Sequence, residues 1–532
     1  MDKDLLVIQE VRDLCRIAKS AQSKLKEFTQ EQIDKIVSAM AEAGYAAREK
    51  LAKMAVDETG FGKFEDKIAK NEFATRNVYE FIKNLRTVGV IETDSQKKVQ
   101  KIAEPMGVVA GIIPSTNPTS TTLFKALIAV KSRNAIVFSP HPKAIGCILE
   151  TVKIMREAAE GNGVPNGLLG CTTIPTLEGT QELMRHPDVA VILATGGAGL
   201  VKAAYSAGKP AYGVGPGNVP AFIERTADVK KAVADIVLSK TFDNGTVCAS
   251  EQSVIVDKPI EQQVIEEFTA HGAYFMNESE IQMTARTLVG PKLDVNPDLE
   301  GQPAARIAKT AGFEVPPDTS ILIARQKGVG EAYPLTIEKL SPVLTFFVED
   351  GWEAGCERCI EVLNFGGLGH TLVIHSHDQK IIDEFGLKKP AFRILVNTPG
   401  THGAVGLTTT LEPSLTLGCG TYGGNITADN VTPLHLLNIK RVAYETKPVS
   451  QAIGTSQSIS AETTTKSTPH FPYQAALAPV ASRKVVTEKD AIASNKQSTD
   501  TISDNIQFGS SNLSAAEIDR IVREFMAQRS HK

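Results

Sequence analysis

From Gly107 onwards, short continuous apolar segments alternate with segments of helical periodicity, and this alternation restricts the folds open to the chain. GVVAGIIP, residues 107–114, ends at a proline and is typical of a strand buried on both faces. STTLFKALIAVKSR, residues 120–133, then predicts a helix, and AIVFS, residues 135–139, predicts the next strand. Because strands that alternate with helices form parallel sheets, we predict an α/β fold.

The alternation continues towards the C-terminus, whereas the N-terminal part is helical. Further strands are predicted at GLLGCTTI (167–174), VAVILATGG (189–197), SVIVD (253–257), PVLTFFVED (342–350), HTLVIHS (370–376) and RILVNT (393–398). Residues 1–85 carry apolar side chains at spacings of three and four, which predicts helices. TQEQ at residues 29–32 has the threonine and the glutamine of a capping box.

The bulk composition excludes several classes of protein. The 532 residues carry a net charge of −4, which gives no electrostatic case for binding nucleic acid or an anionic membrane. No stretch approaches the roughly 20 apolar residues that span a bilayer, and the charged N-terminus is unlike a secretory signal. Seven scattered cysteines fit a reducing compartment better than a disulfide framework. We therefore expect a cytoplasmic protein.

The C-terminal part differs in composition from the rest. Residues 446–511 are rich in Ser, Thr, Ala, Gln and Pro, which predicts a flexible, disordered linker. Residues 512–528 then have a capping-box pattern at Ser514 and Glu517, followed by an apolar stripe, and predict an amphipathic helix. Because so short a helix is marginal alone in water, it needs a groove to lie in. That groove belongs either to another protein, which the long linker favours, or to the chain's own domain.

Two local motifs each allow a structural and a chemical interpretation. Cys248 lies in TFDNGTVCAS, residues 241–250, and is either a nucleophile or a small apolar residue that fills space. Asn117, in PSTNPTS at residues 114–120, follows a predicted strand and opens a helix. Its amide is a suitable donor for a developing oxyanion, but asparagine is also a common N-cap residue of helices.

Two further segments are ambiguous in the same way. LATGGAGLVKAAYSAGKP, residues 193–210, predicts a strand, a glycine turn and a helix, where a phosphate could approach the helix N-terminus. It lacks the GxGxxG spacing, and the chain has no P-loop pattern. Glu338 precedes an apolar strand, where a glutamate is often a solvated charge.

Several long motifs, in one order, make the chain similar to the aldehyde dehydrogenase superfamily over residues 1–443. The resemblance is strongest to its CoA-acylating branch, which includes propanal and acetaldehyde dehydrogenases of bacterial microcompartments. The motifs that carry it are PSTNPT, FDNGTVCASEQSVIV, KLSPVL, RILVNTPGTHGAVG and GCGTYGGN followed by HLLNIK.

The resemblance implies an architecture of two parallel α/β domains and an oligomerisation arm. Residues 1–220 would form the NAD-binding domain and residues 221–420 the catalytic domain that carries the thiol. The arm would consist of strands at about 94–106 and 430–444. Because the family exchanges this arm between subunits, we expect a homodimer or homotetramer.

The resemblance also implies roles for individual residues. Cys248 would attack the aldehyde carbon to give a thiohemiacetal, and later carry the acyl group as a thioester. Asn117 would hold the oxyanion together with the backbone N–H of Cys248. Glu338 would bind the nicotinamide ribose. The remaining cofactor-binding positions would be Pro114, Ser139, Thr195 and Gly196.

Two departures from the family bear on the reaction. Hydrolytic members have a glutamate that activates water, whereas this chain has Val214 at about that position, so transfer of the acyl group to coenzyme A is favoured. At the adenosine ribose, Ser139 stands near the place of a family lysine and a proline near that of an acidic residue. We therefore expect NAD as the cofactor only because the CoA-acylating branch usually uses NAD.

The remaining cysteines and histidines predict no metal site. CERC at residues 356–359 has no second cysteine pair, and the histidines of residues 369–377 have no acidic or cysteine ligands gathered with them. In the branch, a histidine like His370 lies near the active site, so His370 either handles CoA or the thiol proton, or packs in the core.

The expected activity is the oxidation of a short-chain aldehyde, propanal or acetaldehyde, by NAD and CoA. The family parallel makes residues 512–528 an encapsulation peptide for a microcompartment shell protein and places the enzyme inside that compartment. Two alternatives stay open: a hydrolytic aldehyde dehydrogenase that forms the free acid, and a non-catalytic shell-binding protein that keeps the fold.

Overall fold

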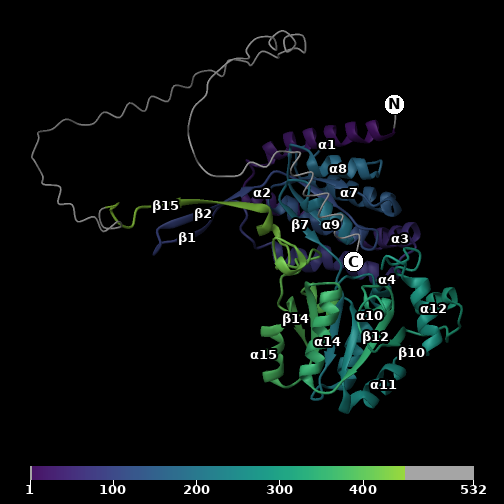
Figure 1. Ribbon diagram of the computed structural model, residues 1–532. Coiled ribbons are helices and arrows are strands. Elements are labelled where there is room, and N and C mark those ends of the chain that lie inside the picture. Colours follow the sequence, from purple (N-terminus) through teal and green to yellow (C-terminus); the bar gives the residue numbers. More distant parts are fainter. Residues whose placement is uncertain (1–2, 450–532) are drawn as a thin grey trace, which may run out of the picture. The chain divides into compact units, whose positions relative to one another are not determined.

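The computed structural model describes residues 3–449, and these contain two parallel sheets and one small antiparallel sheet (Figure 1). The first is five-stranded, with the strand order β5-β4-β3-β6-β7 and every pair parallel. Its strands are β3 (Val108–Ile112), β4 (Ala135–Ser139), β5 (Leu169–Cys171), β6 (Val189–Thr195) and β7 (Ala211–Val214). All residues of β3 and β4 are buried, as their continuous apolar sequences predict.

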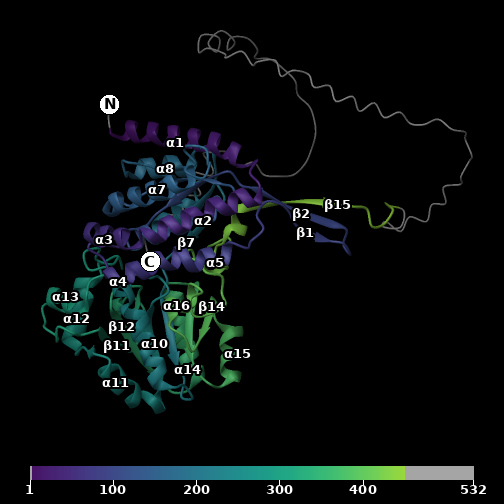
Figure 2. The same cartoon turned by 180° about the vertical axis from the view of Figure 1, so that it is seen from behind.

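Helices cover both faces of this sheet. α6 (Pro118–Lys131) and α7 (Ile145–Glu160) lie on one face, whereas α1 (Lys3–Leu25), α8 (Leu177–Arg185) and α9 (Ala198–Tyr205) lie on the other. The N-terminal segment continues through α2 (Gln30–Ala46), α3 (Arg48–Thr59), α4 (Phe64–Glu72), a π-helical turn (Phe73–Asn77) and α5 (Val78–Ile82), seen in Figure 2. The capping box predicted at residues 29–32 is formed, with Thr29 and Gln32 bonded reciprocally.

The second parallel sheet has seven strands in the order β10-β11-β12-β9-β8-β13-β14. They are β8 (Val219–Ile223), β9 (Glu251–Asp257), β10 (Ala273–Phe275), β11 (Ile321–Arg325), β12 (Val343–Glu349), β13 (Gly369–His375) and β14 (Ala391–Val396). The helices packed around it are α10 (Val229–Thr241), α11 (Glu261–Ala270), α12 (Glu278–Leu288), α13 (Ala304–Ala311), α14 (Trp352–Phe365), α15 (Gln379–Lys388) and α16 (Gly400–Ala404). The predicted α/β class with parallel sheets is thus confirmed.

The antiparallel sheet consists of β1 (Gly89–Asp94), β2 (Val99–Pro105) and β15 (Leu437–Ala443). In both views these strands extend away from the two larger sheets (Figures 1 and 2). The sheet includes β1, which precedes the segment 94–106 that the sequence assigned to an arm. Asn134 ties this region to the five-stranded sheet, because its Nδ2 donates to Leu436 O at 2.9 Å and its Oδ1 accepts from Gly107 N at 2.7 Å.

The chain leaves the five-stranded sheet after Val214 and enters the seven-stranded sheet at Val219. The functional division at residue 220 remains a prediction. The linker and the amphipathic helix predicted for 446–511 and 512–528 lie, apart from residues 446–449, outside the described residues.

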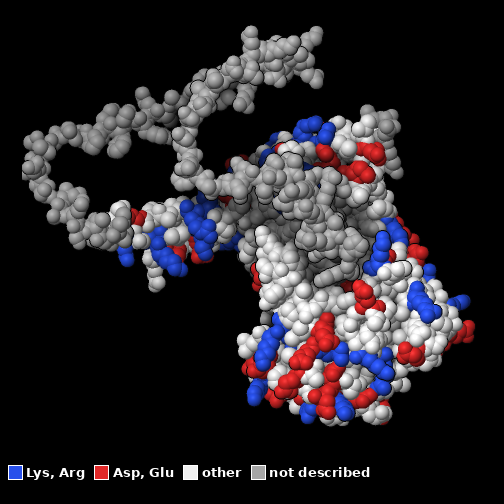
Figure 3. Space-filling view, in the orientation of Figure 1, with Lys and Arg blue, Asp and Glu red and all other residues white. Residues whose placement is uncertain are grey.

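Two surface properties complete the description of residues 3–449. None of their helices combines the length and the apolar composition that a membrane crossing requires. On the face shown in Figure 3, acidic and basic side chains are interspersed over the lobe that carries α14 and α15.

Candidate active site

A cavity of about 610 Å³ opens where strands of the five-stranded sheet end. Pro114 follows β3, whereas Ser139, Thr195 and Val214 are the last residues of β4, β6 and β7, and all four line the cavity. Crevices at the carboxyl ends of parallel strands are the usual ligand sites of open α/β sheets. The other lining residues include Asn117, Gly196, Cys248 and Glu338. Seven of the eight predicted site residues therefore line one cavity.

Cys248 reaches this cavity from the loop between α10 and β9. A 3₁₀ turn, Phe242–Gly245, starts the loop, and its Asp243 and Asn244 have left-handed backbone angles, with φ of 51° and 52°. His370, the eighth predicted residue, lies at the start of β13 and is fully buried. Its Nε2 lies 3.2 Å from Cys248 Sγ. The structure thus places His370 against the thiol. The sequence alone allowed either a chemical role for His370 or packing in the core.

The two groups titrate far from their ordinary pKa values. Burial, with the nearby charge of Glu338, raises the pKa of Cys248 to about 12. Burial also holds the pKa of His370 well below its ordinary value. Cys248 is therefore a thiol and His370 a neutral imidazole near pH 7. In the tautomer with its hydrogen on Nδ1, His370 donates to Thr371 Oγ1 at 2.9 Å and Nε2 is left to accept the thiol proton.

Asn117 occupies the N-cap position of α6, but its side chain makes no capping hydrogen bond. Its Nδ2 instead donates to Thr246 O at 3.2 Å and to Thr116 Oγ1 at 3.2 Å. Its Oδ1 accepts from Lys70 Nζ at 2.6 Å. The side chain is turned towards the loop of Cys248, so the interpretation as a capping side chain is wrong.

The part of the cavity beyond the thiol fits a dinucleotide. Among the described residues, the buried Oγ1 of Thr195 has no hydrogen-bond partner, so it is available to a ligand. Gly197, at the start of α9, has open space where a Cβ would lie. Glu338 Oε1 accepts from Gly217 N at 2.8 Å, and burial raises the pKa of this carboxyl to about 8. Ser139 Oγ lies 2.8 Å from Thr180 Oγ1.

Sequence reasoning missed one feature of this site. Lys67 and Lys70 of α4 are buried and contact Asp243, although lysines on a helix usually lie in solvent. Their spacing of three residues, which puts both on one helix face, was the signal available. In the glycine- and proline-rich segment 212–222, whose composition indicates a tight backbone passage, the backbone of Gly217 approaches Cys248 O closely.

The two cysteines of the CERC segment do not line this cavity. Cys356 and Cys359 are buried in α14, and Cys356 contacts Lys389. Within residues 3–449 every cysteine is a free thiol, and no three His, Cys, Asp or Glu side chains are grouped to hold a metal.

Comparison with known proteins identifies the family. The model of the aldehyde dehydrogenase family matches residues 8–337. The bifunctional aldehyde-alcohol dehydrogenase AdhE of Escherichia coli (strain K12) is 45% identical over 441 residues, which are 82% of this chain and 49% of that protein. The succinate-semialdehyde dehydrogenase (acetylating) of Clostridium kluyveri is 38% identical over 437 residues, 82% of this chain and 96% of that protein. The chain therefore belongs to the aldehyde dehydrogenase family.

Solved structures agree with this assignment. An acetylating aldehyde dehydrogenase from Geobacillus thermoglucosidasius superposes with a TM-score of 0.83 at 54% identity, covering 84% of this chain and 99% of that one. A propionaldehyde dehydrogenase from the fucose utilisation microcompartment of Clostridium phytofermentans gives 0.73 at 26% identity, covering 81% and 96%. The predicted aldehyde dehydrogenase-like fold is confirmed. The chain spans about half the length of the bifunctional relatives that it matches.

Proposed function

We propose that the chain is a CoA-acylating aldehyde dehydrogenase, which converts a short-chain aldehyde, NAD and CoA to acyl-CoA and NADH. The observation that carries the proposal is the position of Cys248 Sγ, 3.2 Å from His370 Nε2 in a cavity that Asn117 also lines. A nucleophile beside a base and an oxyanion donor is the arrangement that covalent catalysis on a carbonyl carbon requires.

In this proposal Cys248 Sγ bonds to the aldehyde carbon while the thiol proton passes to His370 Nε2. The carbonyl oxygen becomes an oxyanion, and the amide N–H of Asn117 stabilises it. NAD, when bound, accepts the hydride that leaves the carbon, and the sulfur–carbon bond becomes that of a thioester. Thr195, Gly196 and Glu338, with Pro114 and Ser139, would hold the dinucleotide in the cavity that they line.

The second half of the reaction would transfer the acyl group to CoA rather than to water. Val214 lines the cavity, and the family resemblance puts it at about the position of the water-activating glutamate of hydrolytic members. The thiol of CoA needs less activation by a general base than water does, because it is more acidic and more nucleophilic. His370 is placed to accept the proton of that thiol. The word "acetylating" in the names of two similar proteins supports this choice.

The substrate and the setting are proposed on the same basis. Propanal and acetaldehyde are the leading candidates, and the similarity to a microcompartment propionaldehyde dehydrogenase supports a place inside such a compartment. We further propose that β1, β2 and β15 join subunits into a homodimer or homotetramer. The segment 512–528 would bind a shell protein.

The test is NADH formation from propanal and from acetaldehyde, each with and without CoA, followed by mass spectrometry of the product. Turnover that requires CoA and yields the thioester is the expected result, and Cys248→Ala should abolish it while NAD still binds. Free acid formed without CoA would instead identify a hydrolytic enzyme. No NADH with any aldehyde under either condition would favour the shell-binding alternative.

A further inference from the structure

Two buried lysines of α4 share one buried carboxylate. The side chains of Lys67 and Lys70 are 2% and 6% exposed, and that of Asp243 is fully buried. Lys67 Nζ donates to Asp243 Oδ2 at 2.6 Å, and Lys70 Nζ contacts the same oxygen. Burying two cations with one anion costs free energy unless the cations find further hydrogen-bond acceptors. The other acceptors of the two lysines therefore indicate the role of the cluster.

Those remaining bonds go to the segment that carries the proposed oxyanion donor. Lys67 Nζ donates to Thr116 O at 2.8 Å, and Lys70 Nζ donates to Asn117 Oδ1 at 2.6 Å. Lys70 Nζ also donates to Thr246 Oγ1 at 3.1 Å, two residues before Cys248. The ammonium of Lys70 therefore touches both the segment of Asn117 and the loop of Cys248.

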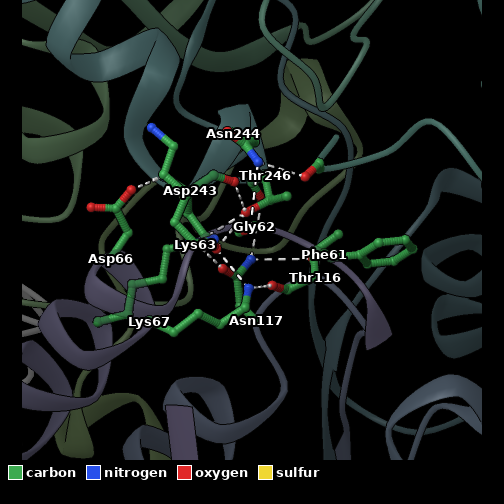
Figure 4. A network of polar contacts seen from close by, with 12 residues as sticks. Phe61, Gly62, Lys63, Asp66, Lys67, Thr116, Asn117, Asp243, Asn244 and Thr246 are labelled. Carbon is green, nitrogen blue, oxygen red and sulfur yellow. Dashed lines mark hydrogen bonds and ion pairs between the residues drawn. The ribbon is translucent and has the colours of Figure 1, made fainter. Parts of the chain in front are cut away.

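Asp243 fixes the second of these segments. Its Oδ1 accepts from Lys63 N at 2.8 Å and its Oδ2 from Thr246 Oγ1 at 2.7 Å, while its own N–H donates to Asp66 Oδ2 at 2.7 Å. Figure 4 shows this network, with Asp243 between the α4 residues and Thr246. Since Asp243 and Asn244 hold left-handed angles that few residues adopt freely, these bonds also keep the loop in its conformation.

We propose that Lys70 is a positioning residue, which orients the Asn117 amide so that its N–H faces the oxyanion formed at Cys248. The inference rests on the proposed acylating reaction and adds a residue to it. A primary amide has an acceptor end and a donor end of almost equal size, so something must decide which end faces the substrate. An ammonium can only donate, and it therefore binds the oxygen end and leaves Nδ2 as the donor end. Nδ2 donates to Thr246 O and to Thr116 Oγ1, and the developing oxyanion would take the place of Thr116 Oγ1.

The charge of Lys70 has a second effect on the amide. A cation at Oδ1 draws electron density from the amide and makes its N–H a stronger donor, as in other charge-assisted networks. Asp243 maintains that charge, because its attraction opposes the burial that lowers the pKa of Lys70 to about 8. Lys67, bound to the same oxygen of Asp243, acts in the opposite direction, because its charge also lowers the pKa of Lys70.

The experiment is a double-mutant cycle on the full chain, with Lys70→Met, Asn117→Ala and both together. The readouts are kcat and KM for NADH formation from propanal with CoA, and the dissociation constant for NAD. Lys70→Met should lower kcat by about 10- to 100-fold, the loss of one hydrogen bond from a charged group. KM and NAD binding should change by less than about 3-fold, since the lysine acts through Asn117 on the transition state.

The cycle distinguishes positioning from mere support of the fold. In the Asn117→Ala background, the further change to methionine at residue 70 should cost less than about 2-fold, because its target is gone. An equal loss in both backgrounds would overturn the inference. Lys153→Met, on the half-exposed face of α7, is the matched control and should behave as the parent protein. If Lys70→Met does not fold, Lys70→Gln replaces it in the same cycle with the same expected direction, because a neutral amide can accept as well as donate and so no longer selects the oxygen end of Asn117.

Failure of this inference and failure of the proposed function give different results. A parent protein that forms no NADH from any aldehyde refutes the function before any variant is made. An active parent with an unaffected Lys70→Met variant refutes only the role of Lys70.

Discussion

Replacing Gly217 with alanine should disable the site where its backbone lies close to the loop of Cys248. A Cβ at Gly217 would lie 2.1 Å from Cys248 O and 3.1 Å from His370 Cδ2. The φ of Gly217 is not in the left-handed region, so alanine causes no backbone strain there. The effect of Gly217→Ala should therefore come from this overlap alone.

The magnitude follows from the size of the overlap. Ordinary contact begins at 3.4 Å, so the Gly217 segment and the Cys248 carbonyl must part by about 1.3 Å. A misplacement of about 1 Å at a reacting group costs on the order of 100-fold in rate, or about 2.7 kcal/mol. Overpacking of a buried site also costs about 1–3 kcal/mol of stability. The hydrogen bond from Gly217 N to Glu338 is expected to break with the shift.

The assay is CoA-dependent NADH formation, measured beside thermal unfolding. Gly386→Ala is the control, because its Cβ would meet nothing within 4 Å on the exposed side of α15. That variant should keep full activity. A folded Gly217→Ala protein with the parent's kcat/KM would refute the argument that this approach fixes the thiol.

Three further predictions concern titration and the acyl acceptor. Since burial raises the pKa of Cys248 to about 12, its alkylation by iodoacetamide without NAD should still accelerate above pH 9, and a plateau below pH 9 would contradict this. The pKa of Glu338, about 8, lies above its ordinary 4.5, so the folded state loses stability as pH rises between these values. Glu338→Gln should therefore gain in unfolding temperature relative to the parent from pH 5 to pH 8.5, and a constant difference would refute it. Val214→Glu should form some free acid from propanal without CoA, detected by mass spectrometry, whereas unchanged CoA dependence would argue against Val214 as the determinant.

Local sequence determined the elements that depend on neighbours along the chain. The apolar segment before Pro114 and the segment at residues 135–139 became fully buried parallel strands, because burial on both faces requires continuous apolar sequence. The threonine and glutamine of residues 29–32 formed their capping box because both partners lie within one helical turn. The order of the motifs was enough to identify the family.

Contacts between distant segments decided the chemistry of the site. Asn117 stands at a helix N-cap, yet Lys70, 47 residues earlier, and Thr246, 129 residues later, hold its side chain. His370 meets Cys248 across 122 residues. Sequence patterns report which face of an element is apolar, but not which partner a polar side chain finds. Burial makes those partners obligatory, since an unpaired polar group in the interior is costly, so only the tertiary structure showed that the α4 lysines belong to the site.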